Sequence, residues 1–93
     1  MRYTTKQEPI AKVEYFFKKI SVIAFRLKEK LKVGEKVRIF GKGGRINITQ
    51  EVTSIQIENE PIQEANPGDM IGLLITQEIP QGCNPIDCDV FKV

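Results

Sequence analysis

The sequence contains no histidine and only two cysteines among its 93 residues. Without histidine, the chain cannot form the Ser-His-Asp or Cys-His arrangements that activate a nucleophile. Its 12 acidic residues fall at outward or loop positions of the elements predicted below, whereas an acid–base pair needs an enclosed environment. The sequence therefore predicts that the protein is not an enzyme. A hydrolytic or redox enzyme that uses Cys83 is the remaining catalytic alternative.

Long apolar runs are also missing. No run approaches the roughly 20 residues that a membrane-spanning helix requires, and the polar N-terminus lacks the apolar stretch of a signal peptide. We therefore expect no membrane association and a cytoplasmic location. The polar residues at the start of the chain predict an N-terminal lead-in at residues 1–9, and the length predicts one folded domain at residues 10–93.

A phosphate-binding loop is absent as well. The segment Gly41-Lys42-Gly43-Gly44-Arg45 contains glycines and a lysine, but it does not match the G-x-x-x-x-G-K-[S/T] pattern. It also joins two predicted strands, and no helix follows whose N-terminus would favour phosphate. We expect no nucleotide and no cofactor.

Charge is abundant and unevenly distributed. Residues 1–46 have thirteen Lys and Arg against four Glu, a net charge of +9, while residues 47–93 have one Lys against eight Asp and Glu, a net charge of −7. Such a split favours a basic face for nucleic acid. Equally, basic and acidic strands can lie side by side and neutralise each other across a sheet.

Apolar and polar residues alternate along much of the chain, which is typical of half-buried strands. Phe16 is expected on the outer face of the first strand, and residues 18–31 also fit helical spacing. The β-branched and aromatic residues between positions 22 and 25 favour a strand there. The alternation places four side chains of the first strand on its inner face: Ala11, Val13, Tyr15 and Phe17.

A change in the alternation marks a bend. Apolar positions are even up to Val52 and odd from Ile55 onward, so we expect a bulge near Thr53-Ser54. Glycine and proline mark turns elsewhere, notably at Asn66-Pro67-Gly68-Asp69. Six or seven short strands separated by such turns predict an all-β fold, a six-stranded closed antiparallel barrel.

Three fragments follow one another at characteristic spacing: Leu31-Lys32-Val33-Gly34-Glu35-Lys36-Val37-Arg38-Ile39, Val52-x-Ser54-Ile55-Gln56-Ile57 and Ile62-x-x-Ala65-x-x-Gly68-Asp69-x-Ile71-Gly72. Their order and spacing resemble the β-barrel second domain of translation elongation factors of the elongation factor Tu type. The resemblance covers residues 10–93, and that family's fold is also a six-stranded closed barrel.

The first hairpin, residues 13–24, is similar to stand-alone elongation-factor-like proteins and to the barrel attached to some collagenase-type peptidases. The resemblance implies a non-enzymatic translation factor-like barrel that binds tRNA or ribosomal RNA or docks on the translation machinery. The alternative is a protein-interaction module that docks on a separate enzyme such as a collagenase-type peptidase.

Basic and aromatic residues of the first half are the candidates for RNA binding, because lysine and arginine neutralise phosphates and outward aromatic rings stack on bases. The alternative is that the basic residues form a solvated face and that the two phenylalanines cover an end of the barrel. The candidates are Lys18, Lys19, Arg38, Lys42, Arg45, Phe16 and Phe40.

Cys83 and Cys88 are separated by four residues. A disulfide between them would close a short loop, whereas a reducing compartment favours free thiols. Two ligands cannot complete a zinc tetrahedron, so a metal would require a second chain. We therefore assign no metal site to this chain and leave disulfide and free thiols open.

Overall fold

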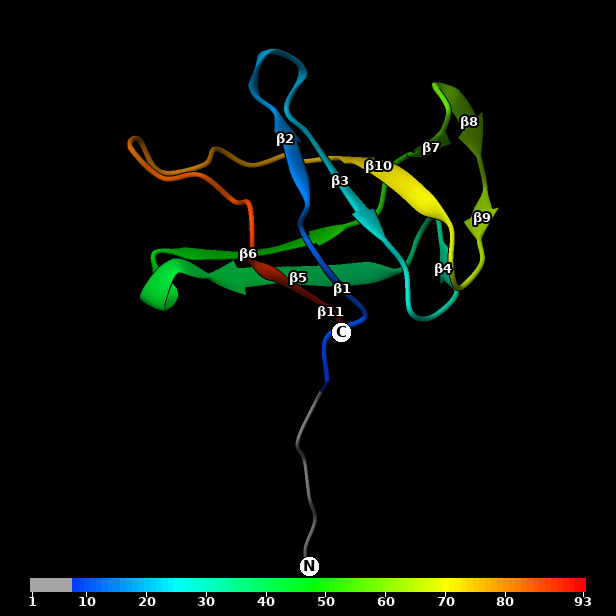
Figure 1. The fold of residues 1–93 in the computed structure, drawn as a ribbon, viewed down its shortest axis with the longest axis horizontal. Coiled ribbons are helices and arrows are strands. Elements are labelled where there is room, and N and C mark those ends of the chain that lie inside the picture. Colours follow the sequence, from blue (N-terminus) through cyan, green and yellow to red (C-terminus); the bar gives the residue numbers. More distant parts are fainter. Residues whose placement is uncertain (1–7) are drawn as a thin grey trace, which may run out of the picture.

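The computed structural model describes residues 8–93, so most of the predicted lead-in lies outside the described residues. Residues 8–93 form short strands and two single-turn 3-10 helices (Figure 1). The elements are β1 (Ala11–Lys12), β2 (Tyr15–Phe17), η1 (Lys18–Ile20), β3 (Val22–Arg26), β4 (Leu31–Lys32), β5 (Lys36–Gly41), η2 (Lys42–Gly44), β6 (Ile46–Glu51), β7 (Ile55–Ile57), β8 (Glu60–Ile62), β9 (Glu64–Ala65), β10 (Met70–Leu74) and β11 (Asp89–Lys92).

The strands divide among three antiparallel sheets. A four-stranded sheet has the order β1-β11-β5-β6, a five-stranded sheet has the order β2-β3-β10-β7-β8, and β4 pairs with β9. Figure 1 shows the four-stranded sheet in the lower part of the view and the five-stranded sheet above it. The all-β class is confirmed, but the predicted closed six-stranded barrel is wrong, because no sheet within residues 8–93 closes on itself and the arrangement is that of a small sandwich.

The core lies between the two larger sheets and draws on both. Ile39 and Val90 from the four-stranded sheet and Phe25 and Leu73 from the five-stranded sheet are all fully buried in one cluster. Gln50 is the buried polar residue of the described chain. Its amide nitrogen donates to the Leu74 carbonyl at 2.8 Å, and its Oε1 accepts from the Thr76 N–H at 2.9 Å. The Gln50 side chain therefore joins β6 to the segment that follows β10.

The chain passes from one sheet to the other through bends. Near Thr53-Ser54, where a bulge was predicted, the strand is interrupted between β6 and β7, which belong to different sheets. A second bend lies between β1 and β2, which the alternation did not predict. Because each bend interrupts a ladder, the sheets remain separate and open.

The second bend contains a β-bulge. Tyr15 faces Ala24 in the ladder, yet the N–H of Glu14 also donates to the Ala24 carbonyl, at 2.9 Å. Two consecutive residues therefore oppose one, which shifts every later side chain of the strand to the other face. The prediction that Tyr15 and Phe17 point inward is wrong: both are about half exposed, and Phe16 packs against the core.

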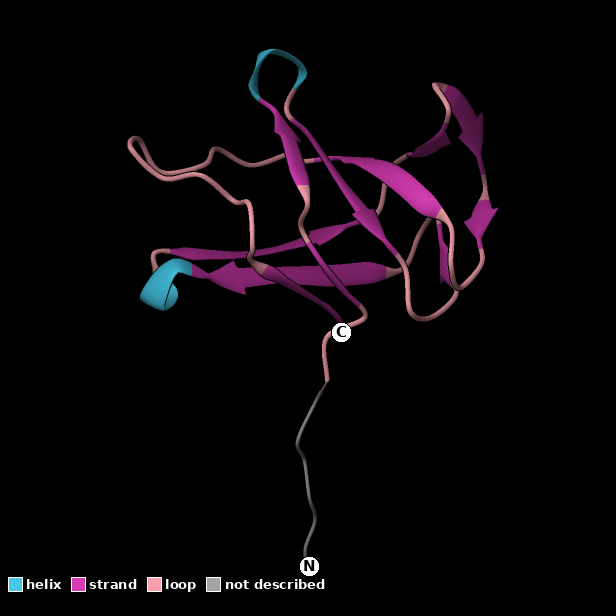
Figure 2. Ribbon diagram, in the orientation of Figure 1, coloured by secondary structure: helices cyan, strands magenta, loops and turns pink. Residues whose placement is uncertain are grey.

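The segment between β10 and β11 contains no strand and is drawn as a continuous loop in Figure 2.

The turn predicted at 66–69 is confirmed. Gly68 has a φ of 93°, and the Asp69 carboxylate accepts a hydrogen bond from the Asn66 N–H at 2.8 Å. Within residues 8–93, no helix has the length and apolar character needed to cross a membrane.

Candidate interaction site

The outer face of the five-stranded sheet is rich in exposed apolar side chains (the sheet face). Phe17 is 51% exposed and Ile20 is 62% exposed. The rings of Tyr15 and Phe17 stack with their centroids 6.5 Å apart, which places a broad aromatic surface in contact with water. The sheet face comprises Tyr15, Phe17, Ile20, Val22, Met70 and Leu74.

A groove of about 330 Å³ crosses the sheet face. Its floor includes Ala24 and Gly72, which face each other in the ladder. A side chain at Gly72 would fill the floor, since its Cβ would lie 3.3 Å from Val22 Cγ1. Phe17 and Ile20 line one side, and the turn between β7 and β8 lines the other. Small residues between larger walls are what make this surface concave.

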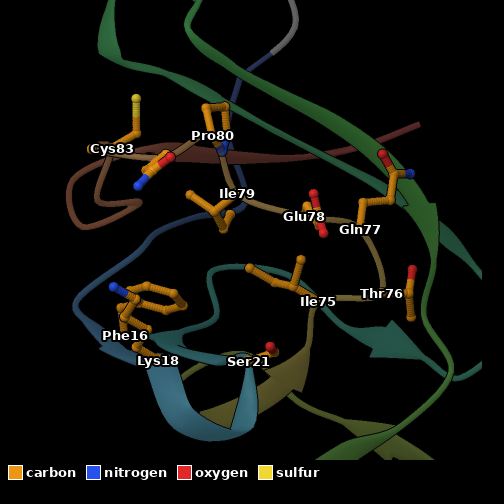
Figure 3. A pocket seen from close by; sticks show the side chains of 12 residues that line it. Phe16, Lys18, Ser21, Ile75, Thr76, Gln77, Glu78, Ile79, Pro80 and Cys83 are labelled. Atoms are coloured by element: carbon orange, nitrogen blue, oxygen red, sulfur yellow. The ribbon is translucent and has the colours of Figure 1, made fainter.

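A larger cleft of about 670 Å³ lies beside β2 (the β2 cleft). One wall is formed by Phe16, Lys18 and Ser21, and the other by residues 75–83 of the loop that follows β10. Figure 3 shows Phe16 and Lys18 across the cleft from Ile79 and Cys83. The lining is both apolar and charged, with Glu78 among the loop residues.

The basic residues predicted to bind RNA are placed at separate points. Lys18 and Lys19 lie in η1, at the tip of the hairpin between β2 and β3, whereas Lys42 and Arg45 lie at the tip of the hairpin between β5 and β6. Figure 1 shows these two tips well apart, one at the top and one at the lower left. The structure therefore does not gather these four side chains into one patch.

Arg38 and Phe40 are engaged with each other on the outer face of the four-stranded sheet. The Arg38 guanidinium lies over the Phe40 ring, 4.8 Å from its centroid, and Arg38 Nε donates to the Asn47 side-chain oxygen at 2.9 Å. These contacts are a cation–π pair and a hydrogen bond within the sheet. Phe40 points outward as predicted, whereas Phe16, predicted outward, lies against the core because of the bulge.

Both cysteines are free thiols in the structure. Cys83 is partly exposed in the β2 cleft, and Cys88 is buried, with a side chain that is 1% exposed. Burial raises the pKa of the Cys88 thiol, and Lys42 opposes this shift. Within residues 8–93, no group of three or more His, Cys, Asp or Glu side chains is arranged to hold a metal ion.

The sheet face was missed in the sequence because its recognition depends on the bulge. Simple alternation counts Tyr15 and Phe17 as core residues, and the extra residue at Glu14 reverses that assignment. The local sequence contains no glycine or proline that would mark a bulge there. The register with β3, which is a tertiary feature, decides which side of the strand faces water.

No family model matches the sequence, and no curated protein matches it. Among solved structures, the chain is similar to the C-terminal domain of a Geobacillus thermoleovorans protein assigned to the U32 peptidases. The match covers 100% of this chain and 99% of that domain, with a TM-score of 0.74 and 17% sequence identity. The selenomethionine variant of the same domain matches over 92% of this chain and 98% of its own, with a TM-score of 0.71 and 16% identity.

These matches correct the predicted resemblance to an elongation factor domain, which is wrong, and they give no support to an RNA partner. The fragments that carried the resemblance encode structural features: Gly34 has a φ of 100° in its turn, and Ala65 and Ile71 are buried in the core. Turns and core positions of this kind do not distinguish families that need the same local geometry. The chain has the fold of the C-terminal domain of a U32 peptidase protein.

Proposed function

We propose that this domain is a non-catalytic protein-interaction module that docks on an enzyme through its sheet face. The candidate partner is the catalytic domain of a peptidase of the collagenase type. The exposed aromatic and aliphatic side chains of the sheet face carry the proposal. The likeness in fold to the C-terminal domain of a U32 peptidase protein supports the choice of partner.

The physical basis is the cost of leaving this surface in water. Removing apolar surface from water is favourable by roughly 25 cal/mol per Å² before the costs of association are subtracted, and aromatic side chains that enter a groove are typical centres of binding energy. Phe17 and Ile20 stand beside a groove whose floor is kept open by Ala24 and Gly72. An apolar side chain of the partner would fill this groove while Phe17 and Ile20 become buried.

The test is binding of the 93-residue chain to the catalytic domain of the U32 peptidase from the same organism, measured by biolayer interferometry. We expect F17S and I20S each to weaken binding by about tenfold or more, as substitution of a central apolar anchor does. V93S is the matched control, because Val93 is 67% exposed and lies outside the sheet face. It should bind like the unsubstituted chain.

Three results would count against the proposal. The peptidase domain could fail to bind, V93S could weaken binding as much as F17S, or the chain could bind tRNA with a steep salt dependence and leave the peptidase unbound. The circular dichroism spectrum and urea midpoint of each variant show whether a loss of binding reflects unfolding. Because Phe17 and Ile20 are exposed, both variants are expected to fold.

A further inference from the structure

Strand β2 has one paired edge and one open edge. It is the terminal strand of the five-stranded sheet and pairs with β3 alone among the strands of residues 8–93. The β2 cleft lies along the open edge: Phe16, Lys18 and Ser21 line its near wall, and the loop of residues 75–83 lines its far wall. Figure 1 shows this loop leaving the end of β10, crossing β2 and then extending to the side of β2 opposite β3.

The backbone of Phe16 is directed toward this open edge. The Ile75 N–H donates to the Ser21 carbonyl at 2.8 Å, so the backbone hydrogen-bonding groups of Ser21 point toward the β10 side of β3. Those of Ile23, two residues later, point to the same side. Phe16 is opposite Ile23 in the ladder. In an antiparallel pair, residues that do not exchange hydrogen bonds turn their N–H and C=O groups outward. Phe16 therefore offers one donor and one acceptor to the cleft side.

The side chains around the β2 cleft include both apolar and charged groups. Phe16, Ile75 and Ile79 supply apolar surface, and Phe16 and Ile79 are partly buried against the core. Lys18 supplies a positive charge at the η1 end of the cleft. Glu78 contributes a negative charge from the loop wall, so an acidic ligand group would be favoured near Lys18 and disfavoured near Glu78.

We propose that the β2 cleft binds an extended peptide segment that adds as a strand to the open edge of β2. Its backbone pairs with Phe16, an apolar side chain enters between Phe16 and Ile79, and an acidic side chain pairs with Lys18. Addition of a strand to an exposed sheet edge is an established mode of peptide recognition, in which backbone bonds give affinity and alternate side chains give specificity. The site is separate from the sheet face, because Phe16 and Phe17 point to opposite sides of the sheet.

The first experiment selects ligands from a random heptapeptide library displayed on phage, with the complete 93-residue chain as bait. A heptapeptide spans roughly 23 Å when extended, which is enough to follow a short edge strand. We expect the enriched peptides to combine β-branched or aliphatic residues with Glu or Asp. The proposal is overturned if no peptide is enriched, or if the same peptides are enriched on the K18E variant.

The second experiment measures the affinity of an enriched peptide, made synthetically, by fluorescence polarisation. K18E should weaken binding about fivefold to tenfold, as reversal of a charge at a binding site does. K19E is the matched control, because Lys19 is the next residue and carries the same charge but does not line the cleft. Equal losses for K18E and K19E would indicate general charge attraction and would overturn the proposed position of the peptide.

The third experiment tests strand addition directly by amide hydrogen exchange. The peptide should slow exchange of the Phe16 amide at least about tenfold, with a smaller effect at Tyr15 and Phe17, whose amides already face β3. A version of the peptide with an N-methylated backbone should bind about tenfold more weakly, since it loses a ladder hydrogen bond. Binding without protection of the Phe16 amide would show that the peptide does not extend the sheet.

These outcomes are independent of the docking function proposed above. F17S and I20S alter the sheet face and should leave peptide affinity within about twofold, while K18E should leave peptidase binding within the same range. Failure of one proposal is therefore visible without failure of the other.

Discussion

Glu14 and Tyr15 both lie opposite Ala24. The Glu14 N–H donates to the Ala24 carbonyl at 2.9 Å, and Tyr15 is the ladder partner of Ala24. This bulge assigns Tyr15 and Phe17 to the surface and Phe16 to the core side of the sheet. Both candidate surfaces depend on it. Without the extra residue, the aromatic pair of the sheet face would point inward, and Phe16 would leave the β2 cleft.

Deletion of Glu14 is therefore expected to be far more damaging than its substitution. Removal of the residue forces the strand after it to change faces, so we expect a loss of about 3 kcal/mol or more in the free energy of unfolding, or no folding. E14A keeps the backbone bond that forms the bulge, and since Glu14 is exposed, it should stay within about 0.5 kcal/mol of the unsubstituted chain. Urea denaturation compares the two, and equal effects would contradict the role of the bulge.

Gln50 is expected to stabilise the connection between the sheets. Q50A removes the side chain that bonds the Leu74 carbonyl and the Thr76 N–H, and we expect a loss of about 2–3 kcal/mol because two partly buried hydrogen bonds are lost together. Q77A is the control: its side chain also donates to a backbone carbonyl, that of Thr49 at 2.7 Å, but at an exposed position. A loss below about 1 kcal/mol is expected there. The free energy of unfolding in urea measures both, and a Q50A effect no larger than that of Q77A would contradict the prediction.

Glycine at position 41 is expected to be required for stability, because Cys88 packs against it. A Cβ at Gly41 would lie 2.7 Å from Cys88 Sγ and 3.0 Å from Cys88 Cα. The φ of Gly41 is 174°, an extended conformation open to any residue, so the cost of G41A arises from the contact. We expect about 1–3 kcal/mol, as for other overpacked positions.

A double-mutant cycle with C88A tests this origin. If the contact causes the loss, the loss caused by G41A should be smaller when Cys88 is already alanine, since the sulfur contact is gone. Strictly additive losses in thermal unfolding would place the cause elsewhere.

The two thiols are expected to differ in reactivity. In the folded chain, without reductant, Cys83 should react with Ellman's reagent and Cys88 should react far more slowly, because Cys88 is buried and its thiol pKa is raised. In denaturant both should react. A count of zero thiols under denaturing conditions would show that a disulfide connects them, and C83S identifies which thiol reacts in the folded chain.

The raised pKa of Cys88 also predicts how stability changes with pH. Above about pH 8.5 the unfolded chain ionises this thiol, while the folded chain keeps it protonated, so the folded state binds more protons and stability falls as pH rises. The contribution is fully present below the unfolded pKa and is lost on the way to the folded pKa. The comparison of urea midpoints at pH 7 and pH 9.5 should show a larger drop for the unsubstituted chain than for C88A, and an equal drop would contradict the assignment.

The strands that follow a simple alternation could be predicted from the sequence. Ile23, Phe25 and Leu27 are buried as their spacing indicates, and the turn at Gly68 follows from its neighbours Pro67 and Asp69. The bend after Val52 could also be predicted, because the apolar positions change from even to odd there. These features are local, since each depends on residues only a few positions apart.

The candidate sites could not be predicted in the same way. The groove requires Ala24 beside Gly72, and the β2 cleft requires Phe16 beside residues 75–83, so both depend on contacts between segments that are far apart in the sequence. The basic residues that appeared to form one group in the sequence lie at two hairpin tips. Proximity along the chain does not determine proximity on a folded surface.

The sequence by itself determined that this is an all-β domain, because the period-two pattern and the turn residues act within each segment. It also excluded catalysis by a histidine-dependent nucleophile, because the residue is missing. The tertiary structure decided how the strands divide into open sheets and which face of β2 meets water. Those outcomes depend on register between distant strands, and a shift of one residue, as at Glu14, reverses the face that every following side chain occupies.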